Sequence, residues 1–132
     1  MAGGKGKRLR PITNKIPKPM IKISGKPILQ KLIENVKNQG FKNIIISTHY
    51  LHNKIKKYFK DGKKFNVNIN YIKEKKPMGT AGCLSLISRK KISENFVVSN
   101  SDIICKINFV DALAYHVKNK SDITLLTKNV LT

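Results

Sequence analysis

Apolar residues of this chain alternate between helical spacing and short strand-like runs, and this alternation limits the fold more than any other feature. They recur at helical spacing in 27–39, and the continuous run NIIIST follows at 43–48. Such a run is typical of a strand buried on both faces. The same alternation predicts further helices from Leu51 to the DG of 61–62, at 80–88 and at 108–117, and further strands at 67–72, 95–102 and 122–127. Strands that alternate with helices indicate a mostly parallel sheet with helices on both faces.

The predicted fold is therefore α/β, a doubly wound, Rossmann-like arrangement in which residues 1–132 form one domain or part of one. Ligands of such sheets bind beyond the carboxyl ends of the strands, where the strand order reverses. We expect the fold to be incomplete at both ends. Only Met1 and Ala2 precede a glycine-rich turn that should follow a strand, and the chain stops soon after the strand at 122–127.

The charge balance is strongly basic, with 27 Lys and Arg against 7 Asp and Glu and a formal net charge of +20. This excess predicts attraction to any polyanion, including nucleic acid, nucleotides and anionic membrane. The lysines are spread over every segment, which is more typical of a solvated surface than of one binding patch. A basic nucleic-acid-binding protein stays an alternative, although the sequence has no RNP motif, helix-turn-helix or zinc knuckle.

Cysteine usage and hydropathy indicate a cytoplasmic protein. The two cysteines, Cys83 and Cys105, form no CxxC motif, which fits a reducing compartment better than a disulfide framework. No apolar run approaches the roughly 18 residues of a membrane span. The start of the chain also lacks the apolar segment of a signal peptide.

The opening stretch MAGGKGKRLRP combines Gly3, Gly4 and Gly6 with closely spaced cations. Glycine lets a backbone bend sharply and approach a ligand, and the cations favour an anionic ligand. The stretch is not a Walker A loop, because Arg8 follows the GK pair, and it is not a dinucleotide fingerprint, because Leu9 replaces the third glycine. On these residues alone, a plain turn remains an equal alternative.

The continuation of this stretch resembles the sugar-1-phosphate nucleotidyltransferases. The signature glycines are followed by Arg8, Leu9 and Pro11, and then by Pro17, Lys18 and Pro19. SGKPIL before the first helix, PMGTAG at 77–82 and NSD at 100–102 also match, in the same order. The resemblance covers essentially the whole chain and is closest to the guanylyltransferases that make GDP-mannose and related GDP-sugars.

The resemblance implies transfer of a nucleoside monophosphate from a nucleoside triphosphate, with a preference for GTP, to a sugar 1-phosphate for polysaccharide or glycoconjugate precursors. It implies no specific nucleic acid and no membrane as partner, and it leaves a homo-oligomer open. Family members continue well past this length, so residues 1–132 should be the nucleotide-binding half, with the sugar site and a second metal carboxylate beyond Thr132. Alone, the chain should turn over poorly, and a catalytically incomplete nucleotide-binding fragment is a further alternative.

By resemblance, Arg8 and Lys18 are the catalytic cations and Asp102 is the Mg²⁺ ligand. Arginine offers a bidentate fork to phosphate oxygens, and Mg²⁺ prefers hard carboxylate oxygens together with substrate phosphates. From the residues alone, Asp102 is more often a cap of the next turn. Ser101 stands where the family usually has glycine, and it would be strained if that position requires a positive φ.

The resemblance also implies a set of nucleotide contacts. Backbone N–H groups of a glycine turn can hold phosphates, and the PMGTAG segment would lie against the base. An ordinary junction between a loop and a helix would look much the same as that segment. The expected nucleotide-binding residues are Ala2, Gly3, Gly4, Gly6, Lys7, Glu74, Pro77, Gly79 and Thr80. His49 and His52 lack a third ligand nearby and are interpreted as surface or packing residues.

Overall fold

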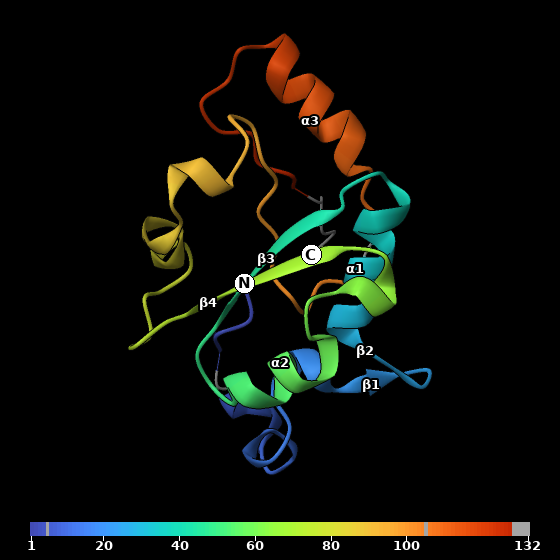
Figure 1. Cartoon of the computed structure of the whole chain (residues 1–132), viewed down its shortest axis with the longest axis vertical. Helices are drawn as coiled ribbons and strands as arrows, with labels where there is room; N and C mark the ends of the chain where they lie inside the picture. The colour runs from blue at the N-terminus through green and yellow to red at the C-terminus, as the bar shows by residue number, and fades with distance from the viewer. Residues whose placement is uncertain (5, 105, 128–132) are drawn as a thin grey trace, which may run out of the picture.

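The structure is a computed structural model that describes residues 1–4, 6–104 and 106–127 (Figure 1). Cys105, named above, and Lys5 of the opening stretch lie outside the described part. Short 3-10 helices include η1 (Lys7–Leu9), η3 (Lys18–Met20) and η5 (Gly82–Leu86). The strands and α-helices are β1 (Lys22–Ile23), β2 (Lys26–Pro27), α1 (Ile28–Asn38), β3 (Asn43–Thr48), α2 (His52–Phe59), β4 (Asn68–Lys73) and α3 (Phe109–Lys118).

Strands β3 and β4 form a parallel pair at the centre of the molecule (Figure 1). The register runs from Asn43 opposite Asn68 to Thr48 opposite Lys73. Parallel strands need a crossover between them, and α2 supplies it. The predicted strands at 43–48 and 67–72 and their parallel pairing are therefore confirmed.

Residues Met1 and Ala2 lie between β3 and the segment 99–101. The Ala2 N–H donates to the Ser47 carbonyl at 2.7 Å, and Ala2 forms a parallel bridge with Thr48. On the other side, the Met1 nitrogen donates to the Ser99 carbonyl at 2.7 Å, and the Ser101 N–H donates to the Met1 carbonyl at 3.0 Å.

The order across the sheet is therefore 99–101, 1–2, β3 and β4. The chain first adds β3 and then β4 on one side of residues 1–2, and it later places residues 99–101 on the other side. This reversal at the centre is what a doubly wound α/β sheet requires. The predicted α/β class with parallel pairing is confirmed, and the reversal point lies at residues 1–2.

Three predicted elements differ from the structure. The segment 95–102 is not a strand, because among the described residues its backbone pairs only with the short stretch 1–2, and Phe96 and Val98 remain 45% and 44% exposed. Residues 122–127 are not a strand either, since within the described part no neighbouring strand pairs with them. At 80–88 the structure has the 3-10 helix η5, preceded by Gly79 at a φ of +73°, which no α-helical residue adopts.

The core lies between the β3–β4 pair and the two helices α1 and α2. Leu29 and Ile33 of α1 and Ile55 and Phe59 of α2 are buried in the same cluster, which confirms the apolar faces expected for both helices. The other buried members are Ala2, Ile46, Val67 and Ile69. Since Ala2 belongs to this cluster, the stretch that precedes the glycine turn is anchored in the core.

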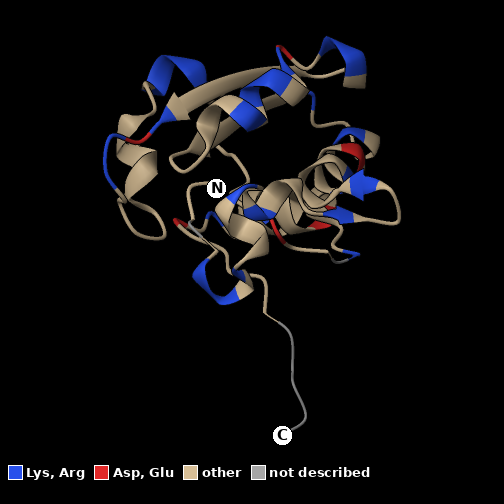
Figure 2. Cartoon of the chain, turned by 90° about the horizontal axis from the view of Figure 1, so that it is seen from below, with Lys and Arg blue, Asp and Glu red and all other residues tan. Residues whose placement is uncertain are grey.

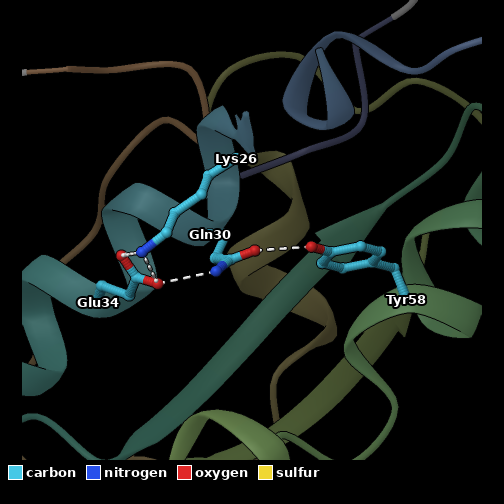
Figure 3. Close-up of polar contacts among 4 residues, drawn as sticks. All are labelled: Lys26, Gln30, Glu34 and Tyr58. Carbon is cyan, nitrogen blue, oxygen red and sulfur yellow. Dashed lines mark hydrogen bonds and ion pairs between the residues drawn. The ribbon is translucent and has the colours of Figure 1, made fainter. Parts of the chain in front are cut away.

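A chain of polar contacts joins α1 to α2 (Figure 3). The Tyr58 hydroxyl donates to Gln30 Oε1 at 2.7 Å, and Gln30 Nε2 donates to Glu34 Oε1 at 2.8 Å. The Lys26 ammonium contacts the Glu34 carboxylate at 3.0 Å. The hydrogen bonds from Gln30 and Lys26 lower the pKa of Glu34 below its usual value. Their stabilising effect is present at neutral pH and is lost as the pH falls through that lowered pKa.

The start of α3 is capped by Asn108, together with Asp111 three residues later. Asn108 Oδ1 accepts from the Asp111 N–H at 3.1 Å, and Asn108 Nδ2 donates to Asp111 Oδ2 at 2.6 Å. Gln39, which follows α1, accepts from the Phe109 N–H at 2.6 Å and so connects the two helices. In the described part of the chain, no helix is long and apolar enough to cross a membrane.

We predict that Ile55→Val lowers the free energy of unfolding by about 1 kcal/mol, because it removes a methyl group from a side chain that is 0% exposed. The matched control is Ile12→Val, at a side chain that is 57% exposed, and it should change stability by less than about 0.5 kcal/mol. Urea unfolding measures both changes. Equal effects of the two substitutions would contradict the core assigned here.

Candidate functional site

A cavity of about 420 Å³ opens at the carboxyl end of the sheet, beside the point where the strand order reverses. Four segments contribute to it: the glycine turn, η3, the loop after β4 and residues 100–102. Its lining residues are Met1, Ala2, Gly3, Gly4, Lys18, Pro19, Glu74, Pro77, Met78, Gly79, Thr80, Cys83, Asn100, Ser101 and Asp102. The topology of the sheet therefore places four distant parts of the sequence around one space.

The glycine turn bends immediately after Ala2 leaves the sheet. A Cβ at Gly3 would lie 2.9 Å from Glu74 Oε1, so only glycine allows this close approach. Gly6 has a φ of +60°, and the Thr13 hydroxyl donates to its carbonyl at 2.8 Å. A positive φ strains residues that carry a side chain. The turn therefore has the backbone geometry that its sequence predicts.

Lys18 and Asp102 form an ion pair on the wall of the cavity, between Lys18 Nζ and Asp102 Oδ2. Their side chains are 40% and 29% exposed, so both remain accessible from the cavity. The prolines on either side of Lys18, Pro17 and Pro19, are buried and fix its backbone. A cation and a carboxylate predicted from separate motifs thus meet at one place.

Glu74 is only 6% exposed and joins three parts of the site. Its Oε1 accepts from the Ser47 hydroxyl at 2.6 Å, and its Oε2 accepts from the Met78 N–H at 3.2 Å. Its own N–H donates to the Thr48 carbonyl at 2.8 Å. Both carboxylate oxygens therefore bind protein groups, and they hold the loop 77–80 against the end of β3.

The two histidines have separate partners. His49 Nδ1 donates to the Glu74 carbonyl at 2.9 Å, and His52 Nδ1 lies 2.6 Å from the Thr48 hydroxyl. Burial, followed by the charges of Lys73 and Lys56, lowers the pKa of His52. These contacts give each histidine a structural role, in line with the interpretation from sequence.

Most of the predicted site residues meet in this cavity. They are Ala2, Gly3, Gly4, Lys18, Glu74, Pro77, Gly79, Thr80 and Asp102. Gly6, Lys7 and Arg8 do not line it. Gly6 shapes the turn, while Lys7 and Arg8 lie on η1 directly after it, with Arg8 exposed.

Sequence reasoning missed several lining residues. Met78, Asn100 and Ser101 lie inside or beside quoted motifs, so their position in the sequence could have identified them. Cys83 is 3% exposed and directly follows PMGTAG, so its position beside that motif could likewise have identified it. Ser101 is also buried, but it is not among the described residues with a positive φ, so the strain considered for this position is not found.

The donor set fits a metal that is shared with a substrate. Within the described residues, no three His, Cys, Asp or Glu side chains come together as an all-protein metal site. Asp102 nevertheless presents a hard carboxylate oxygen to a cavity that could hold phosphates. Mg²⁺ is usually bound by one or two carboxylates, water and substrate phosphate oxygens, so a single carboxylate is compatible with it.

Residues 1–131 match the family model described as nucleotidyl transferase. The chain belongs to this family. The match covers nearly the entire chain and confirms the resemblance seen in the glycine turn, the PKP stretch and the NSD motif.

Curated nucleotidyl transferases are also similar to this chain in sequence. The D-glycero-alpha-D-manno-heptose 1-phosphate guanylyltransferase of Aneurinibacillus thermoaerophilus is 36% identical over 129 residues, which cover 97% of this chain and 55% of that relative. The UTP–glucose-1-phosphate uridylyltransferase of Synechocystis sp. is 36% identical over 141 residues, which cover 98% of this chain and 36% of that relative.

The crystal structure of HddC from Yersinia pseudotuberculosis, complexed with GMP-PN, is similar to this chain with a TM-score of 0.77 and 33% sequence identity. That similarity covers 88% of this chain and 52% of HddC. The chain thus spans about half, or less, of the length of the relatives it matches.

We predict that Gly3→Ala lowers the free energy of unfolding by about 1–3 kcal/mol, because the added Cβ would overlap Glu74 Oε1. Displacement of Glu74 should also weaken its bond to the Met78 N–H and speed hydrogen exchange at that amide. Gly4→Ala is the matched control, since a Cβ there meets nothing within 4 Å. Exchange at Met78 that is the same in both variants would contradict this role of Glu74.

Proposed function

We propose that this protein transfers a nucleoside monophosphate from a nucleoside triphosphate, preferably GTP, to a sugar 1-phosphate. The products are a nucleoside diphosphate sugar and pyrophosphate. Residues 1–132 would supply the nucleotide-binding half of the domain. The observation that carries the proposal is the single cavity lined by the glycine turn, Lys18 and Asp102.

The cavity supports this proposal because its parts suit a triphosphate. The backbone of Gly3 and Gly4 lines it without side chains, which leaves space for N–H groups to approach phosphate oxygens. Lys18, on the neighbouring η3, adds a compact positive charge to the lining. Arg8 lies on η1, directly after the glycine turn. Its exposed side chain would move to contact the phosphates.

The reaction joins two anions, so its barrier is mainly electrostatic and positional. A sugar phosphate oxygen forms a bond to the α-phosphorus, and the bond from that phosphorus to the pyrophosphate oxygen breaks. The negative charge that leaves is carried by pyrophosphate. Lys18 and Arg8 would hold the phosphates in line and offset the charge that develops on them.

Asp102 would hold a Mg²⁺ ion through its carboxylate. A bound Mg²⁺ neutralises phosphate charge and orients the oxygens around the phosphorus. Asp102 directly follows the segment that pairs with Met1, so its position relative to the glycine turn is set by the sheet. The contribution of this chain is therefore to fix the separation between the carboxylate and the phosphate-binding backbone.

The loop 77–80 would lie against the nucleoside base. Pro77, Gly79 and Thr80 line the cavity, and Glu74 holds this loop from behind through the Met78 N–H. A guanine base is favoured by the guanylyltransferase named above and by the GMP-PN in the HddC complex. The matched uridylyltransferase makes uracil the main competitor.

A second candidate, nonspecific binding of polyanions, follows from the net charge of +20. Figure 2 shows Lys and Arg on most segments of the chain rather than along one stripe. Charge spread in this way attracts nucleic acid of any sequence and is screened by salt. Selectivity among nucleotides therefore distinguishes the two candidates.

We predict that GTP with Mg²⁺ raises the melting temperature of the chain at moderate salt, while equal concentrations of dTTP, UTP and CTP raise it less. A ligand at about 100 times its Kd would stabilise the folded state by about 2.7 kcal/mol. Differential scanning fluorimetry measures the shifts. Equal shifts with every nucleotide and with RNA, all lost as salt rises, would support the polyanion candidate instead.

We predict that Arg8→Ala and Asp102→Ala each lower turnover of the full-length protein by about 10²–10³-fold or more, because each removes stabilisation of developing charge. Lys22→Ala is the matched control, since Lys22 is an exposed cation of β1 outside the cavity. Pyrophosphate release measures turnover, and circular dichroism checks that the fold survives. A variant at Arg8 or Asp102 with near-normal turnover would remove that residue from the mechanism.

A further inference from the structure

We propose that Lys18 and Asp102 form an exchangeable pair that couples the binding of metal and nucleotide. This inference rests on the nucleotide site of the proposed function and adds a step to it. Before ligands bind, the Lys18 ammonium neutralises the Asp102 carboxylate. When both ligands bind, Lys18 moves to a phosphate and Asp102 becomes free to bind a divalent cation.

The geometry of the pair carries the proposal. Each partner is one that the proposed reaction needs elsewhere, yet in this structure Lys18 Nζ contacts Asp102 Oδ2. Both side chains face the same cavity and are partly exposed, at 40% and 29%, so either can turn toward a ligand. The pair is therefore not a buried structural ion pair.

The backbone allows this exchange to occur by side-chain motion alone. Pro17 and Pro19 restrict the segment of Lys18, and the Ser101 N–H is bonded to the Met1 carbonyl directly before Asp102. A lysine side chain has four rotatable bonds, so its ammonium can move several ångströms while its Cα stays in place. The exchange needs no change in the sheet or in the glycine turn.

The charges explain why the two ligands should help each other. A nucleotide without metal must draw Lys18 away from Asp102 and leaves that carboxylate unpaired near its phosphates. A metal without nucleotide must displace Lys18, and then finds one carboxylate and a nearby ammonium. With both ligands present, the Lys18 ammonium faces a phosphate and the metal ion faces the Asp102 carboxylate. Coupling of this kind is reciprocal, because each ligand must raise the affinity of the other by the same factor.

A double-mutant cycle in metal-free buffer tests the proposal. GTP binding to the chain is measured by calorimetry with EDTA present, for wild type, Asp102→Asn, Lys18→Gln and the double variant. Removal of the competing carboxylate should tighten GTP binding by about threefold to fivefold where Lys18 is present, the range expected for a partly exposed ion pair. In the Lys18→Gln background, the same Asp102→Asn change should tighten binding less, because it then removes only the repulsion between the carboxylate and the phosphates.

Plain charge repulsion gives a different result in this cycle. If Asp102 only repels phosphates, Asp102→Asn tightens GTP binding equally in both backgrounds, and that outcome overturns the exchange. An absence of any gain from Asp102→Asn overturns it as well. Lys22→Gln is the matched control for the loss of one positive charge outside the cavity.

A second arm uses Mn²⁺ alone, so that it does not depend on nucleotide binding. Lys18→Gln should tighten Mn²⁺ binding, measured by electron paramagnetic resonance, by about threefold to fivefold relative to wild type and to Lys22→Gln. Adding Asp102→Asn to the Lys18→Gln variant should remove this gain in Mn²⁺ binding. Unchanged Mn²⁺ binding in Lys18→Gln overturns the exchange. Failure of GTP to bind any variant would instead contradict the proposed function, while the Mn²⁺ arm still decides between exchange and no exchange.

Discussion

The pairing of residues 1–2 with two separate segments is the constraint on which the rest of the structure depends. Ala2 bonds to the end of β3, and Met1 bonds to the segment 99–101 on the other side. Because parallel strands point in the same direction, their carboxyl ends meet at one edge. The glycine turn and Asp102 leave the sheet at that edge and line the same cavity.

The charges inside the cavity differ from the overall charge of the chain. The chain carries only 7 acidic residues against 27 basic ones, and the cavity contains two of the acids, Glu74 and Asp102. Glu74 is buried and committed to protein donors, whereas Asp102 is accessible and paired with Lys18. The carboxylate of Glu74 therefore holds protein groups in place, whereas the carboxylate of Asp102 is accessible from the cavity.

Strands β3 and β4 and helix α1 could be predicted from sequence patterns, whereas the outcome at 95–102 could not. Helix α1 depends on apolar spacing between residues close in sequence, and that expectation agrees with the structure. The stretch 95–102 has the composition of a strand, but a strand forms only where another strand pairs with it. Motifs located most of the cavity, whereas the position of Lys7 and Arg8 on η1, outside its lining, depends on backbone conformation.

The bond between Met1 and Ser99 joins residues that are 98 positions apart. Closing so long a loop carries an entropic cost that contacts near in sequence do not share, so topologies of this kind form their long-range contacts late. The glycine turn is held by that closure and by Ala2 in the core. The cavity is therefore a property of the completely folded chain, and a shorter N-terminal peptide with the same glycine motif would not contain it.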